Sequence, residues 1–136
     1  MPEIRVCYED TDAGGVVYYG KYLRYLEQGR MEFFRERGLS VFALHEQGYL
    51  IPVTRLEIDY LVPAVLDDLV RVKTTVLEIA RATLVLGQQV FRLRDGALLV
   101  DARVELAFIG AAKKPRRFPP EVLAALYDDA EKRNPE

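Results

Sequence analysis

The side chains that could act as nucleophiles or general bases are few in this sequence. Serine, cysteine and histidine occur once each, as Ser40, Cys7 and His45, and tryptophan is absent. A Ser–His–Asp or Cys–His relay would need these single copies to meet in space. A zinc site would need carboxylate partners, and no ligand spacing is visible around them. We therefore expect no metal and no bound cofactor, and we assign any catalytic chemistry to aspartate or glutamate.

Two acids lie in a loop rich in turn-forming residues. Asp10 and Asp12 are followed by Gly14 and Gly15, and a helical pattern begins a few residues later. Acids at such a place can simply cap the helix and interact favourably with the positive end of its dipole. Spacing alone favours this capping interpretation. The same place can also do chemistry, because a helix N-terminus offers free N–H groups to an oxyanion and glycine lets a substrate approach the backbone.

Hydrophobic periodicity predicts one long helix among strands. Residues 18–37 carry apolar positions at helical spacing, and Gly38 is placed to end the helix. Strict alternation of apolar and polar residues predicts strands with one buried and one wet face, as in an antiparallel sheet. The expected strands are residues 2–8, 53–60, 68–79, 83–94 and 98–109, with a two-residue hairpin turn in 94–97, and the other expected helices are residues 41–47 and 119–129.

Length and composition indicate one globular domain over residues 1–136. Half of the residues are hydrophobic, 29% are charged and the formal net charge is −2. This balance gives no reason to expect nucleic-acid binding, and no apolar run approaches the roughly 20 residues that span a bilayer. With a single cysteine and no long apolar stretch at the N-terminus, we expect a cytoplasmic protein without an integral membrane segment.

The loop motif closely resembles the 4-hydroxybenzoyl-CoA thioesterase family, and most of all its Tol–Pal-associated branch of bacterial acyl-CoA thioesterases. The resemblance covers nearly the whole chain. It rests on Asp10-Thr11-Asp12-Ala13-Gly14-Gly15-Val16-Val17-Tyr18, Tyr22, Glu27, Arg30, Pro63, Leu66-Asp67-Asp68 and Lys114-Pro115-Arg116. It implies the hot-dog fold, a five-stranded antiparallel sheet wrapped around one long central helix, with a short C-terminal helix.

The resemblance also implies an acyl-CoA thioesterase and assigns its site. The catalytic carboxylate falls on Asp12, as a nucleophile or as a general base; the sequence leaves both routes open. The backbone amide that polarises the thioester carbonyl falls near Tyr19, where many members of the Tol–Pal branch carry histidine, so a side-chain proton shuttle of that form is absent here. Substrate contacts are expected from Gly15, Val16, Tyr18 and Tyr22.

Other charged residues have both a structural and a functional interpretation. Asp10 is interpreted as structural, and Glu27 as the reserve catalytic acid or as an ion-pair partner of Arg30. The basic segment, residues 113–119, is either a solvated loop or a grip on the CoA phosphates. The phosphate contacts that the resemblance favours are Lys114, Arg116, Arg117 and, more weakly, Arg81.

A five-stranded sheet around one helix leaves open edges, so we expect a homo-oligomer. By resemblance it is a dimer at minimum, with the active site at the junction, and dimers stack into a tetramer. One rival is a non-catalytic module of the same fold that binds acyl-CoA or an acyl carrier, but it would not need Asp12. Another is a hydratase or dehydratase, which relies on a histidine paired with an acid, and His45 lies outside the loop.

Overall fold

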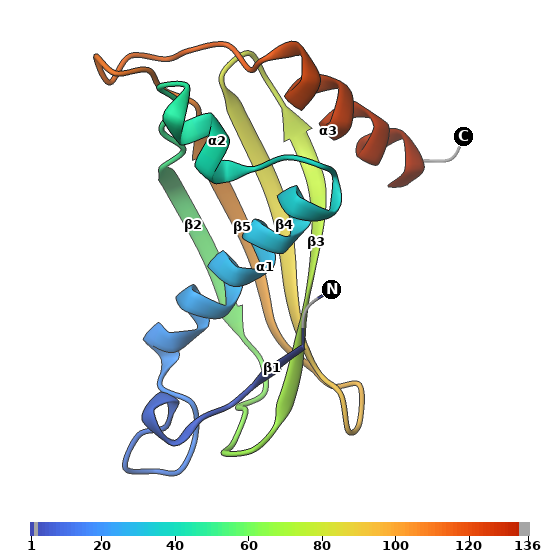
Figure 1. The fold of residues 1–136 in the computed structure, drawn as a ribbon. Coiled ribbons are helices and arrows are strands. Elements are labelled where there is room, and N and C mark those ends of the chain that lie inside the picture. The colour runs from blue at the N-terminus through green and yellow to red at the C-terminus, as the bar shows by residue number, and fades with distance from the viewer. Residues whose placement is uncertain (2, 134–136) are drawn as a thin grey trace. The chain divides into compact units, whose positions relative to one another are not determined.

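The computed structural model describes residues 1 and 3–133, and of residues 129–133 only the backbone. The elements are β1 (Glu3–Arg5), the 3-10 turns η1 (Tyr8–Asp10) and η2 (Tyr19–Lys21), α1 (Tyr22–Glu36), α2 (Val41–Glu46), β2 (Val53–Tyr60), β3 (Leu69–Ile79), β4 (Thr83–Arg92), β5 (Leu98–Ala107) and α3 (Pro120–Arg133) (Figure 1).

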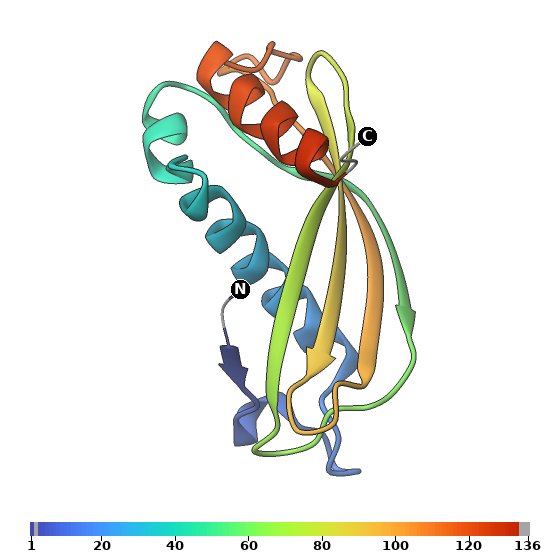
Figure 2. The same cartoon turned by 90° about the vertical axis from the view of Figure 1, so that its right-hand side faces the viewer.

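The five strands form one antiparallel sheet in the order β1-β3-β4-β5-β2. β1, the dark blue strand of Figure 2, pairs with the start of β3. In this pairing Ile4 lies opposite Val70. Burial alternates along the central strands; on β3, Val70, Val72 and Val76 are buried and Lys73 is exposed. The alternation of apolar and polar residues therefore predicted correctly which side chains of these strands are buried. The expected hot-dog fold, with its long helix and short C-terminal helix, is confirmed.

Several element boundaries differ from those expected, and three of them bear on the loops. α1 begins at Tyr22, not at residue 18, because Lys21 N–H donates to the Tyr18 carbonyl and winds residues 19–21 into a 3-10 turn. The first strand ends at Arg5 and is followed by η1. β4 ends at Arg92, so the hairpin loop to β5 is longer than two residues, and Asp95 binds both the Arg92 guanidinium and the Ala97 N–H across it.

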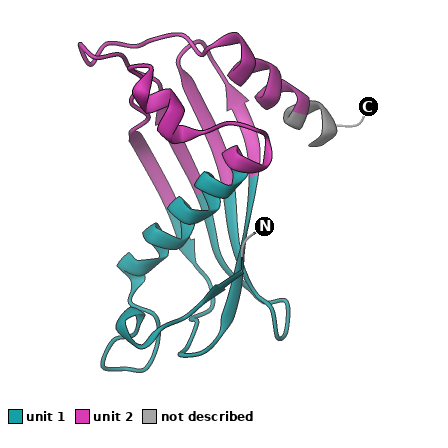
Figure 3. Ribbon diagram, in the orientation of Figure 1, with its two compact units in different colours: residues 1–33, 58–74, 88–102 teal, residues 34–57, 75–87, 103–136 magenta. Residues whose placement is uncertain are grey.

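By their internal contacts the residues form two compact units (Figure 3). Unit 1 comprises Met1–Phe33, Ile58–Thr74 and Gln88–Ala102, and unit 2 comprises Phe34–Glu57, Thr75–Gly87 and Arg103–Glu136. Each is described by itself.

In unit 1, α1 packs closely on β3 and β4 at Gly29. A Cβ added to Gly29 would lie 2.5 Å from Val72 Cγ1, so only glycine fits there. The fully buried Gln88 side chain donates from Nε2 to the Leu26 carbonyl at 3.0 Å and to Thr74 Oγ1 at 2.9 Å. This close contact at Gly29 fixes the first two turns of α1 against the sheet.

In unit 2, Ser40 caps α2 by accepting the Ala43 N–H at 3.0 Å. The rings of Tyr49 and Phe118 both pack edge-on against Phe108, with centroids 6.0 and 4.2 Å away. This aromatic core supports the chain that leaves β5 and leads into α3.

Candidate active site

The hairpin that carries Asp12 reverses the chain within a few residues. Thr11 and Val17 form an antiparallel bridge, and Asp12 N–H donates to the Val16 carbonyl at 2.9 Å. At the tip, Gly15 N–H donates to the Asp12 carbonyl at 3.0 Å. Gly15 has a φ of 82°, which glycine adopts without steric cost, so the glycine that the sequence singled out serves the turn.

Asp12 holds its carboxylate at the exposed tip of this hairpin. Its Oδ1 accepts the Gly14 N–H at 2.8 Å, which orients the side chain in an Asx turn. Within residues 1 and 3–133, Oδ2 has no hydrogen-bond partner. The N-cap of the following 3-10 turn is Tyr18, so Asp12 does not cap a helix. One carboxylate oxygen is held in place and the other is open to a reacting group.

Asp10, by contrast, is 5% exposed. Its Oδ2 accepts both the Cys7 N–H and the Tyr25 hydroxyl, each at 2.9 Å. The first bond closes η1 and the second ties the loop to α1. These contacts support the structural interpretation of Asp10, including a bond to Tyr25 that local spacing did not suggest.

Free backbone N–H groups follow directly after the hairpin. Tyr18 N–H donates to the Asp10 carbonyl at 2.8 Å, and Lys21 N–H donates to the Tyr18 carbonyl at 2.9 Å. Between them, the N–H groups of Tyr19 and Gly20 have no acceptor in the described part of the chain. Unpaired N–H groups at the start of a helical turn carry partial positive charge, which is suited to stabilising an oxyanion.

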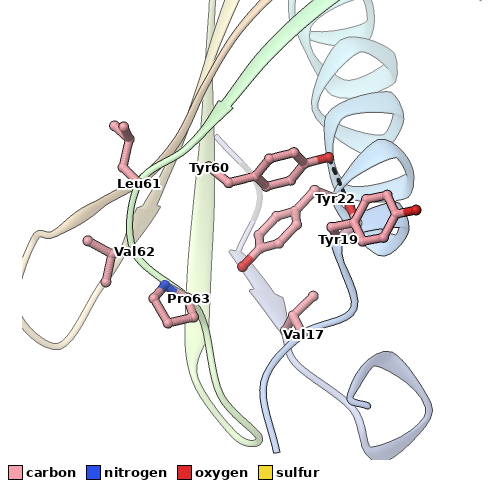
Figure 4. Close-up of a pocket in the computed structure, with 7 residues that line it drawn as sticks. All are labelled: Val17, Tyr19, Tyr22, Tyr60, Leu61, Val62 and Pro63. Carbon is pink, nitrogen blue, oxygen red and sulfur yellow. Dashed lines mark hydrogen bonds between the residues drawn. The ribbon is translucent and has the colours of Figure 1, made fainter. Parts of the chain in front are cut away.

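A cavity of about 180 Å³ lies beside these free amides (Figure 4). Its lining residues are Val17, Tyr19, Tyr22, Tyr60, Leu61, Val62 and Pro63. They come from the end of the Asp12 hairpin, the start of α1 and the end of β2, all in unit 1. None of these side chains is charged, so the cavity suits an uncharged group of modest size.

Two tyrosine hydroxyls of the cavity form hydrogen bonds between the segments that line it. Tyr60 Oη donates to the Tyr19 carbonyl at 3.2 Å, which ties the end of β2 to the peptide that carries the Gly20 N–H (Figure 4). Tyr22 Oη accepts the Ala64 N–H at 3.1 Å. Burial raises the pKa of Tyr22, so this hydroxyl stays protonated at neutral pH.

The cavity wall at Pro63 is anchored by a buried charge cluster. Arg92 is 8% exposed and donates to the Pro63 carbonyl at 3.2 Å, and it lies 3.5 Å from Asp68 Oδ2. Burial opposes ionisation of Asp68, but bonds from the Val65 N–H and from Arg94 outweigh it and hold the pKa below its usual value. The same wall binds the hairpin, since Val16 bridges to Val65. The Asp12 loop and the cavity wall are therefore held by one framework.

The predicted phosphate contacts lie in unit 2. Arg81 is exposed in the turn between β3 and β4, and its carbonyl accepts the Phe118 N–H at 3.4 Å, next to Arg117. Arg116 donates to the Gln47 carbonyl at 3.0 Å, and its guanidinium carbon lies 3.9 Å from the centroid of the Tyr49 ring. The backbone thus brings Arg81 beside the basic segment, and Arg116 is partly committed to the protein itself.

Lys114 and Arg117 are exposed and make no side-chain bond in the part of the chain that the structure describes. Their charges are available to a ligand.

The predicted acyl contacts separate into two groups. Tyr22 lines the cavity, as does Tyr19, which was predicted as the oxyanion donor, whereas Gly15 and Val16 build the hairpin. The ring of Tyr18 is half exposed and lies against Gly20, where an added Cβ would come within 2.9 Å of it. Sequence reasoning missed Tyr60, Leu61 and Val62 as cavity residues; the signal that could have found them is an apolar strand end running into Pro63.

The expected Glu27–Arg30 ion pair is not formed. Arg30 donates from Nη1 to Gln88 Oε1 at 3.0 Å, and among the described residues no carboxylate oxygen of Glu27 lies within ion-pair distance of it. Burial lowers the pKa of Arg30, with Glu27 opposing this from farther away. Glu27 is exposed on α1.

Two further features of the described residues bear on the expected class of protein. They contain no group of three or more histidine, cysteine or acidic side chains arranged to hold a metal. Among them, too, there is no helix with the length and apolar character needed to cross a membrane.

Comparison with known proteins identifies the family. The sequence profile of the thioesterase-like superfamily matches residues 6–126. The chain belongs to this superfamily. A superfamily relative, acyl-CoA thioesterase YbgC of Haemophilus influenzae, is 43% identical over 91% of each chain. The acyl-CoA thioester hydrolase YbgC of Escherichia coli is 34% identical over 89% of this chain and 90% of its own.

The fold of the superfamily agrees as well. The crystal structure of the DHNA-CoA thioesterase of Staphylococcus aureus superposes with a TM-score of 0.92, at 28% identity, over 99% of this chain and 93% of that one. The expected family is therefore confirmed, and so is the expected class of protein, a thioester-hydrolysing enzyme.

Proposed function

We propose that this thioesterase hydrolyses acyl-CoA to the free acid and CoA, with Asp12 as the reacting carboxylate and the Tyr19 N–H as the oxyanion donor. One observation carries the proposal. The hairpin that holds Asp12 ends at Val17, a cavity residue, and the free N–H groups follow within the next three residues. A carboxylate, an oxyanion donor and an acyl-sized cavity thus belong to one continuous stretch of chain. The relatives named as acyl-CoA thioesterases support the same substrate class.

In the proposed reaction the acyl group enters the cavity and its thioester carbonyl oxygen accepts the Tyr19 N–H. Asp12 either attacks the carbonyl carbon to form a mixed anhydride, which water then hydrolyses, or removes a proton from a water that attacks directly. In both routes the C–S bond breaks, CoA leaves as the thiolate, and one water is consumed. The Tyr19 N–H stabilises the tetrahedral oxyanion more than it stabilises the bound thioester, because the negative charge on the carbonyl oxygen develops only as the transition state forms.

The basic segment and Arg81 are proposed to bind the phosphates of CoA, with Lys114 and Arg117 contributing free charges and Arg116 shaping the loop. We also propose a homo-oligomer, a dimer at minimum and a tetramer by stacking. In the single chain Asp12 is exposed, so a second copy is proposed to cover the hairpin and complete the site.

Asp12→Asn tests the proposed carboxylate. Asparagine keeps an Oδ1 that can accept the Gly14 N–H, so the hairpin is preserved while the reactive charge is lost. Turnover of acyl-CoA, followed by thiol release, is expected to fall by roughly 10²- to 10⁴-fold. The matched control is Asp101→Asn, which changes an exposed acid on β5 and is expected to leave turnover unchanged. Normal turnover by the Asp12 variant would end the proposal and favour a non-catalytic acyl-CoA-binding module.

A further inference from the structure

The hydroxyl of Tyr22 is an unused hydrogen-bond donor inside the cavity. Tyr22 is 3% exposed and lines the cavity, and Figure 4 shows its hydroxyl pointing toward Pro63. A phenol can donate one hydrogen bond as well as accept. Tyr22 Oη accepts the Ala64 N–H at 3.1 Å, but across residues 1 and 3–133 no acceptor receives its own proton.

The other two cavity hydroxyls differ from Tyr22. Tyr60 Oη donates to the Tyr19 carbonyl at 3.2 Å, so its proton is used. The Tyr19 side chain is 63% exposed, and Figure 4 shows its hydroxyl directed away from the other labelled side chains. Tyr22 therefore supplies the buried donor that a ligand in the cavity would meet, and a buried donor without an acceptor is unfavourable.

The remaining walls define what can carry the acceptor. Val17, Leu61, Val62 and Pro63 are apolar, and no lining side chain is basic, so a carboxylate on the acyl group would lie against apolar walls without a counter-charge from the lining. A cavity of about 180 Å³ is close to the roughly 150 Å³ that holds a benzene molecule in a protein interior. The group that fits is compact, uncharged and bears an oxygen.

We propose that Tyr22 is a specificity-determining residue that selects compact, uncharged acyl groups carrying a hydroxyl or oxo oxygen over the hydrocarbon groups of the same skeleton. This rests on the proposed acyl-CoA thioesterase function. The Tyr22 proton binds the acyl oxygen while the Ala64 N–H keeps its bond to the same hydroxyl. An acyl group without the oxygen leaves that donor unpaired, and one with a carboxylate is rejected by charge.

Matched acyl-CoA pairs test the proposal. Butyryl-CoA, 3-hydroxybutyryl-CoA and 3-oxobutyryl-CoA share a four-carbon chain, and succinyl-CoA adds the charge. We expect wild-type kcat/KM to be about tenfold higher for an oxygenated member than for butyryl-CoA, and lowest for succinyl-CoA. Tyr22→Phe is expected to bring the oxygenated-to-butyryl ratio to about one. Tyr127→Phe, on the exposed face of α3, is the matched control and should keep the wild-type ratio.

Because each ratio is taken within one protein, loss of stability from the unpaired Ala64 N–H cancels. A wild-type ratio near one overturns the proposal without any variant, and a Tyr22→Phe ratio equal to wild type overturns the assignment to Tyr22. The Kd values of the same compounds, measured by calorimetry on Asp12→Asn with and without Tyr22→Phe, give the ratio in the absence of turnover. If wild type hydrolyses none of them, the proposed function fails, and the Kd ratio still decides whether Tyr22 selects the oxygen.

Discussion

Asp10 and Asp12 are separated by one residue, and their carboxylates meet different surroundings. Asp10 is buried and accepts two protein donors through one oxygen, whereas Asp12 is exposed and, among the residues that the structure describes, accepts only the Gly14 N–H. The difference follows from the backbone: η1 turns Asp10 toward α1, and the bridge between Thr11 and Val17 carries Asp12 outward to the hairpin tip. At this scale the structural acid stabilises the loop on which the proposed catalytic acid is presented.

Asp10→Ala should therefore lower the free energy of unfolding, whereas Asp12→Asn should lower the turnover of acyl-CoA. It leaves the Cys7 N–H and the Tyr25 hydroxyl without their acceptor, each at a cost of about 1–3 kcal/mol in the free energy of unfolding. Urea denaturation measures this, and Asp12→Asn, at an exposed position and with the Gly14 bond kept, is the control with little expected change. An Asp10→Ala variant as stable as wild type would contradict the structural role.

The pH dependence of the Tyr25 contribution follows from its environment. Burial, with the bond to Asp10 second, raises the pKa of Tyr25 above its usual value near 10. The stability that it contributes is therefore present in full below about pH 10 and is lost as the pH rises through the raised value.

At the scale of elements, the turn between β3 and β4 lies beside the basic segment after β5 in unit 2. Their backbones meet where Phe118 N–H donates to the Arg81 carbonyl. Arg116 is held by Gln47 and the Tyr49 ring, so the charges proposed to bind a phosphate are chiefly those of Lys114, Arg117 and Arg81. Replacing Arg116 would disturb the loop as well as its charge, which makes it a poor probe.

Lys114→Gln and Arg117→Gln are the sharper variants. Each is expected to raise the KM for acyl-CoA roughly two- to fivefold at low ionic strength and less at high salt, as for exposed ion pairs. The same acyl group on N-acetylcysteamine lacks the nucleotide, so its KM should not change. Lys73→Gln, at an exposed position on β3, is the matched control. Equal effects on both thioesters would show that the segment does not bind the phosphates.

How far the sequence predicted these elements depends on how local their causes are. β2 begins and ends where alternation placed it, although only Leu56 and Ile58 are partly buried and the rest of the strand is exposed. The 3-10 turn before α1 was missed because apolar spacing does not distinguish it from helix. The Arg30–Gln88 bond joins residues 58 positions apart, and no local pattern encodes it. The cavity was found only in part for the same reason, since Tyr60 meets Tyr19 across 41 positions.

At the scale of the whole molecule, the sheet order leaves β2 at an edge, next to β5 on one side alone. An eight-residue edge strand with free backbone groups invites pairing with another chain unless it is covered. Exposed apolar side chains accompany this edge, among them Val53 on the strand and Leu61 just beyond it. A second copy placed along β2 would bury them, and Leu61 would carry that contact to the cavity.

Light scattering should therefore give at least twice the mass of one chain, and specific activity should fall on dilution as copies separate. In a two-fold interface each substitution occurs on both sides, so Val53→Asp would place a charge in each half of the apolar contact and shift the protein toward monomer. Its turnover should fall in proportion to the monomer formed, because the proposed site is completed by the second copy. Tyr127→Asp also places a charge on an exposed apolar residue, on α3, and should change neither mass nor turnover. A fully active monomer would show that one chain forms the whole site.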